Sequence, residues 1–152
     1  MKLAPLLLIA LAILSPFASA SAFDEINTGY LSDDAVAGYD TTAYFQHAAP
    51  TEGDSDYSFK WNGATWKFAD KASLDLFAAN PDKYRPQYGG YCSNQMSLGN
   101  LSNIDPGVWL IYDDKLYLFG HDVGRERWEN TGVAERIKDA DGYWQKYLAK
   151  NN

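Results

Sequence analysis

The stretch YSFKWNGATWKF, residues 57–68, decides the fold. Aromatic residues alternate with polar ones on both sides of Asn62-Gly63, a dipeptide that accepts the positive φ angles of a two-residue turn. The pattern therefore predicts an antiparallel β-hairpin. Asp70 follows as the expected cap of a helix, whose apolar residues recur at helical spacing until Asn80-Pro81 ends it.

A second hairpin and a long helix are predicted further along the chain. Branched and aromatic residues at 108–112 and 116–119 suit a pleated surface on either side of a polar turn. Asp122 is expected to cap a short helix through Trp128, and apolar residues at three- and four-residue steps predict an amphipathic helix over 133–148. Two hairpins packed with several short helices predict an α+β domain with a small antiparallel sheet, and no internal repeat is visible.

Residues 1–22 have the pattern of a secretory signal peptide, because Lys2 precedes an apolar run that gives way to small residues. The run is shorter than the roughly 20 apolar residues that cross a bilayer. We expect cleavage near Ala20 or Ala22, which leaves a single domain over 23–152 with an N-terminal arm and a C-terminal helical extension. The expected product is periplasmic or secreted, without membrane insertion after cleavage.

Charge and motifs narrow the function further. The net charge of −7 repels nucleic acid and anionic membrane surfaces. The sequence contains no phosphate loop, paired-histidine zinc motif, nucleophile elbow or Cys-x-x-Cys, so hydrolase, nucleotide-binding and thioredoxin-like functions have no support. We therefore expect a binding protein rather than an enzyme, with a metal ion, a small ligand or another envelope protein as its partner.

Four blocks of sequence resemble the YHS-domain family, specifically its secreted bacterial branch. They are GYDTTAYF at 38–45, WNGATWKFA at 61–69, NPDKY at 80–84 and QYGGYC at 87–92. The resemblance implies a small domain that handles soft metal ions through cysteine thiolates. The chain departs from that pattern at Ala43, Ala69 and Ser73, which stand where the metal-binding members carry cysteine. Methyl groups and a hydroxyl do not replace thiolates, so the family's ligand set does not transfer.

A rebuilt metal site would use the remaining soft donors: Cys92, Met96, His47 and His121. Thiolate, thioether and imidazole together favour copper. Cys92 and Met96 lie four residues apart, on one face of a short helix predicted after Gly89-Gly90, with Cys92 in its first turn. The same spacing also describes two residues that pack into the core, and a histidine exposed to solvent needs no ligand to explain it.

Two other interpretations remain open. A lone cysteine after two glycines and at the start of a helix is typical of a stabilised thiolate, which predicts a reactive thiol. Alternatively, Cys92 is structural and the aromatic side chains form a cleft for a small planar or apolar ligand or a partner protein. The aromatic residues concentrated around the motifs are Tyr39, Tyr44, Phe45, Trp61, Trp66, Tyr88, Tyr91, Trp109 and Tyr117.

Overall fold

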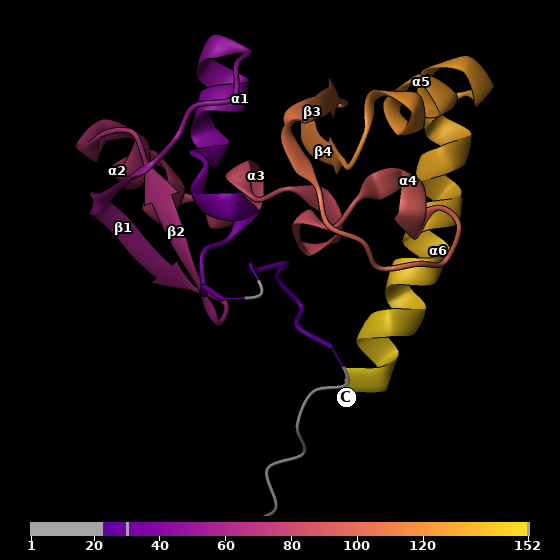
Figure 1. The fold of residues 1–152 in the computed structure, drawn as a ribbon, viewed down its shortest axis with the longest axis horizontal. Coiled ribbons are helices and arrows are strands. Elements are labelled where there is room, and N and C mark those ends of the chain that lie inside the picture. Colours follow the sequence, from indigo (N-terminus) through magenta and orange to yellow (C-terminus); the bar gives the residue numbers. More distant parts are fainter. Residues whose placement is uncertain (1–22, 30, 152) are drawn as a thin grey trace, which may run out of the picture.

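The computed structural model describes residues 23–29 and 31–151 and has the α+β class that the sequence predicts. Short helices surround two antiparallel hairpins, and a long C-terminal helix lies along one side (Figure 1). In chain order the elements are η1 (Val36–Gly38), α1 (Thr41–His47), β1 (Asp54–Trp61), β2 (Ala64–Phe68), α2 (Lys71–Ala79), α3 (Pro81–Tyr84), η2 (Gln87–Gly90), α4 (Ser93–Met96), β3 (Asp105–Tyr112), β4 (Lys115–Phe119), α5 (Asp122–Thr131) and α6 (Val133–Asn151).

The first hairpin forms where the alternation and the Asn-Gly turn predict it. Trp61 lies opposite Ala64, and the turn residues Asn62 and Gly63 have φ angles of 48° and 78°. These left-handed angles match the twist of a two-residue hairpin turn. The register shifts once, between Asp54 and Ser58, so the strand pair carries a bulge near its open end.

Helix α2 closes one face of this hairpin. Phe77 is fully buried and packs on Trp66 and Phe68, at ring-centroid distances of 4.8 and 5.1 Å. Asp70 is the predicted cap, and its carboxylate accepts a hydrogen bond of 2.8 Å from the backbone N–H of Ser73. The cap at Asp70 and the packing of Phe77 together hold α2 against the hairpin.

The second hairpin forms a separate two-stranded sheet, with no ladder to the first. Its strand β4 is buried on both faces. Leu116 and Leu118 face the core of the first half, whereas Tyr117 and Phe119 face a second core built around Trp128. Because side chains alternate along a strand, β4 joins the two cores.

Helix α5 begins one residue earlier than predicted. Asp122 is its first helical residue rather than its cap, and His121 occupies the N-cap position with no capping hydrogen bond from its side chain. The pattern misled because an aspartate is common both at the N-cap and in the first turn. Gly132, with a φ of 100°, then separates α5 from α6.

The two halves of the chain repeat one arrangement of elements, although no repeat is visible in the sequence. Each half begins with a short 3-10 helix that ends in a glycine of left-handed conformation: Gly38 has a φ of 81° and Gly90 a φ of 82°. A tyrosine and a helix N-cap follow in both halves. The N-cap is Asp40 in the first half and Cys92 in the second.

The hairpins of the two halves also correspond residue for residue. Asp54 lies opposite Phe68 in the first hairpin, and Asp105 lies opposite Phe119 in the second, with the same register shift after each pair. In each half a helix N-cap stands two positions after the end of the second strand. Figure 1 shows the first half in violet on one side and the second in orange on the other.

The N-terminal arm passes between these halves and is held by both, whereas the sequence suggests a loose arm or a short helix. The backbone N–H of Asn27 donates to the carbonyl of Gly89 at 2.8 Å, which attaches the arm to the second half. Further along, Ala35 and Asp33 exchange backbone hydrogen bonds with Thr65 of β2, both at 2.8 Å. The arm therefore connects η2 with the first hairpin.

The predicted signal peptide, residues 1–22, lies outside the described residues. Within the described part of the chain, no helix combines the length and the apolar character needed to cross a bilayer.

Candidate functional site around Cys92

Cys92 occupies the N-cap position of α4, one residue before the first turn where the sequence placed it. Its thiol makes no disulfide and is 4% exposed. The sulfur accepts a hydrogen bond of 3.3 Å from the backbone N–H of Gly120, at the end of β4. It also borders a hollow of about 260 Å³. The sulfur is thus buried beside the hollow and is held by one backbone donor.

The hollow is built from four segments of the second half: α4 with its N-cap, the loop that follows α4, the two residues between β4 and α5, and α5. The residues that line it are Cys92, Asn94, Gln95, Ser102, Gly120, His121, Val123, Gly124 and Arg127. His121, Val123 and Arg127 are exposed, whereas Cys92 and Asn94 are buried. The sulfur of Cys92 therefore lies at the base of a small depression with His121 and Arg127 at its exposed rim.

The internal repeat explains why this hollow exists. In the first half, Ala69 follows β2 and Ser73 is the third residue of α2. In the second half, Gly120 follows β4 and Gly124 is the third residue of α5. A Cβ on Gly124 would lie 3.1 Å from the Cβ of Asn94, and one on Gly120 would lie 3.9 Å from the sulfur of Cys92. The second half keeps this space open because glycine stands at both positions.

The first half fills the equivalent place with Asp40. This side chain is fully buried, and its carboxylate accepts hydrogen bonds from the N–H and hydroxyl of Thr42 and from the N–H of Ala69, at 2.8, 2.7 and 3.0 Å. The bond from Ala69 corresponds to the bond from Gly120 to Cys92. Asp40 is therefore a closed structural cap, and Cys92 is its open counterpart.

The structure brings together two of the four metal ligands that the sequence proposes. His121 lines the same hollow as Cys92. Met96 is fully buried within the second core, one helical turn from Cys92, and is absent from the lining of the hollow. His47 ends α1 in the first half, where its charge helps the hydrogen bonds from Ser73 to hold the pKa of Asp70 below its usual value.

The positions where the resemblance places cysteine all belong to the first half. Ala43 lies on α1, Ala69 follows β2 and Ser73 lies in the first turn of α2. Among the described residues, no three histidine, cysteine, aspartate or glutamate side chains gather closely enough to hold a metal ion. A metal at Cys92 would therefore rest on two protein donors, sulfur and imidazole.

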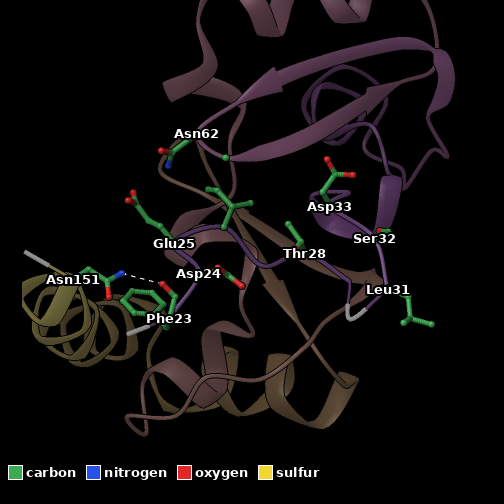
Figure 2. A pocket seen from close by; sticks show the side chains of 11 residues that line it. Phe23, Asp24, Glu25, Thr28, Leu31, Ser32, Asp33, Asn62 and Asn151 are labelled. Carbon is green, nitrogen blue, oxygen red and sulfur yellow. Dashed lines mark hydrogen bonds between the residues drawn. The ribbon is translucent and has the colours of Figure 1, made fainter. Parts of the chain in front are cut away.

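Three other hollows are larger, and two of them are of interest because their linings carry different chemistry. One of about 500 Å³ lies where the two halves meet and is lined by Tyr44, Phe45, Tyr84, Trp109 and Ile111, among others. The other, of about 830 Å³, lies under the N-terminal arm (Figure 2). It is bordered by carboxylates of the arm and by Asn151, whose amide donates to the carbonyl of Phe23 at 3.1 Å.

Sequence reasoning missed the residues that shape the hollow: Asn94, Gly120, Gly124 and Arg127. One signal was available, because GYD at 38–40 and GYC at 90–92 are the same motif with a different cap. Aligning the halves on that motif would have placed Gly120 and Gly124 beside Cys92. Nothing in the spacing of Arg127 marks it.

Fold and site together define a small α+β protein with a repeated hairpin unit and, in its second copy, a buried thiol that borders a small hollow. The chain matches none of the protein-family models, curated proteins or solved structures with which it was compared.

Proposed function

We propose that this is an exported binding protein that holds a soft metal ion, copper(I) first, between the sulfur of Cys92 and the imidazole of His121. The observation that carries the proposal is that these two side chains line one small hollow. Thiolate and imidazole are donors that copper ions accept, and copper(I) tolerates low coordination numbers. His47 is left out because it lies in the other half of the molecule.

The N–H of Gly120 supports such a site by holding the sulfur in place. A hydrogen bond to a metal-bound sulfur orients it and tunes its donor strength, as outer-shell partners do in other metal centres. Met96 contributes packing behind the site rather than a ligand, since its side chain is fully buried in the second core.

Competition for copper(I) between the reduced protein and a chelator tests the proposal. We expect Cys92→Ser to weaken copper binding roughly 100-fold or more and His121→Asn to weaken it roughly tenfold. His47→Asn is the matched control, because it removes an exposed histidine of the other half and should leave the affinity unchanged. Equal affinities for the wild type and Cys92→Ser would rule the site out.

The aromatic hollow supports a second candidate function, the binding of a small planar ligand. Tyr44 and Trp109 pack edge to face at 5.5 Å, and Phe45 and Tyr84 do so at 5.6 Å, so ring faces from both halves border one cavity. Rings in such an arrangement suit a flat apolar guest. Titration with an anilinonaphthalene sulfonate dye tests this: Trp109→Leu should abolish dye binding, and equal binding by that variant would exclude the hollow.

A further inference from the structure

The aromatic hollow where the two halves meet has a charged side chain of each sign in its lining. Lys83 and Asp114 border it together with Phe45, Tyr84 and Trp109. The three aromatic residues are half-buried, so part of each side chain remains accessible to an occupant. A ligand in this hollow would therefore meet aromatic surface, one ammonium group and one carboxylate.

The position of Lys83 indicates which charge these surroundings accept. Its Nζ lies over the ring of Tyr84, 5.8 Å from the centroid, and 3.3 Å from Oδ2 of Asp114. The face of an aromatic ring attracts a cation within about 6 Å, because the ring quadrupole is negative there. A ring and a carboxylate thus already hold a cation of the chain itself beside the hollow.

We propose that this hollow binds small, flat organic cations, such as N-alkylated heteroaromatic rings. The inference rests on the second candidate function given above and names the class of its ligand. The flat ring of the ligand packs against the aromatic side chains, and its positive charge takes the place of the Lys83 ammonium beside Tyr84 and Asp114. A volume of about 500 Å³ is within the usual range for small-molecule sites.

Other charge types fit the hollow less well. An organic anion would meet the negative faces of the rings and the carboxylate of Asp114, and the ammonium of Lys83 is already paired with that carboxylate. The net charge of −7 disfavours the approach of anions still further. A metal ion needs lone-pair donors, which ring faces do not provide. An organic cation is therefore the ligand that the lining favours.

The contacts of Lys83 lead to a specific expectation about its removal. Its ammonium competes with a cationic ligand for the ring of Tyr84 and the carboxylate of Asp114. Removing the ammonium should therefore strengthen the binding of a cation. If Lys83 instead served to bind an anionic ligand, the same change would weaken the binding of that ligand.

Isothermal titration calorimetry of the full-length protein with two probes of similar size and opposite charge tests the proposal. The probes are 1-methylquinolinium and naphthalene-1-sulfonate, both with two fused rings. We expect the cation to bind about fivefold more tightly than the anion. Lys83→Gln should raise the affinity for the cation about threefold and lower that for the anion, whereas Asp114→Asn should lower the affinity for the cation about threefold.

Lys71→Gln is the matched control. Lys71 is an exposed lysine of α2 that pairs with Asp75 and does not line the hollow, so its removal changes the net charge equally and should alter neither affinity. No binding of the cation, equal or tighter binding of the sulfonate, or weaker binding of the cation by Lys83→Gln would overturn the proposal. Dye binding that depends on Trp109 would then still support the second candidate function, whereas its absence would show that both fail.

Discussion

At the residue scale, Asp40 and Cys92 show what one change of side chain does at equivalent positions. Both stand at a helix N-cap, and both accept a backbone N–H from the residue after the second strand. A carboxylate has enough acceptor sites for three donors, and Asp40 uses them to close its surroundings. A sulfur is a weak acceptor that takes one donor, so Cys92 remains available for other bonds.

We expect Asp40→Ala to destabilise the protein by about 3 kcal/mol, because it strands two buried N–H groups and a hydroxyl. The free energy of unfolding, measured with urea, checks this. Asp70→Ala is the control: it removes an exposed cap with one hydrogen bond and should cost about 1 kcal/mol. Equal losses for the two variants would show that the buried network adds nothing.

At the element scale, the two hairpins have the same turn geometry but different turn residues. Asn62-Gly63 suits its left-handed angles, whereas Asp113 and Asp114 adopt φ angles of 50° and 54° at the equivalent place. Aspartate tolerates this conformation less well than asparagine or glycine. The second turn is therefore the more strained of the two.

Replacing Asp113-Asp114 by Asn-Gly should accordingly stabilise the protein by about 1 kcal/mol. The change removes the contact of Asp114 with Lys83, but that pair is exposed and contributes little. Urea unfolding measures the gain. The reverse change, Asn62-Gly63 to Asp-Asp, should produce a loss of similar size, and a stabilising effect there would contradict the argument.

The N-terminal arm depends on a glycine of the second half. A Cβ on Gly89 would lie 1.8 Å from the backbone oxygen of Glu25, and its φ is 61°. Gly89→Ala should displace the arm and lower the free energy of unfolding by about 3 kcal/mol. Limited proteolysis should then cut within 24–29 before it cuts the hairpins.

Gly63→Ala provides the matched control for Gly89→Ala. Its φ is 78°, but nothing lies within 4 Å of the added Cβ. We expect a loss of about 1 kcal/mol from the backbone conformation alone, with the arm still protected. An equally protected arm in Gly89→Ala would show that the close approach to Glu25 does not hold it.

The elements were predictable where local chemistry decides them. The alternation around Asn62-Gly63 and the cap at Asp70 are local signals, and the structure confirms both. The arm was not predictable, because its order comes from backbone hydrogen bonds to distant residues such as Gly89. The candidate site was predictable only in part. Cys92 and His121 line one hollow because the second hairpin lies between them in the sequence, whereas His47 lies in the other half, and no local pattern in the sequence shows that the two halves are separate.

At the scale of the whole molecule, the repeat is not visible in the sequence because equivalent strands of the two halves are packed differently and carry different side chains. Strand β4 is buried on both faces, while β2 is half-buried at alternate positions, so their hydrophobic patterns differ although their pairing is the same. What survives is backbone geometry: the glycines at 38 and 90, the bulge and the turn.

Buried tyrosines make the stability of the whole molecule sensitive to alkaline pH. Burial raises the pKa of Tyr44, Tyr88 and Tyr117 above 10.0, and that of Tyr117 reaches about 12. The folded state thus keeps protons that the unfolded state loses. The stabilisation is complete below about pH 10 and falls as the pH rises toward the folded pKa values, by up to about 1.4 kcal/mol per pH unit for each tyrosine.

Urea unfolding at a series of pH values from about 8 to about 11 checks this prediction, with tyrosinate absorbance as a second readout. Tyr117→Phe should make the fall in stability less steep, because one of the three groups is removed. A free energy of unfolding that stays constant up to about pH 11 would contradict it.

The duplication has a consequence for how this chain tolerates change. The Asp40 unit anchors the fold through contacts that leave no space, while the Cys92 unit places two glycines and a buried thiol around a small hollow. Substitutions around the thiol therefore leave the anchor of the other copy untouched. A chain built in this way is able to acquire new chemistry in one copy while the other preserves its shape.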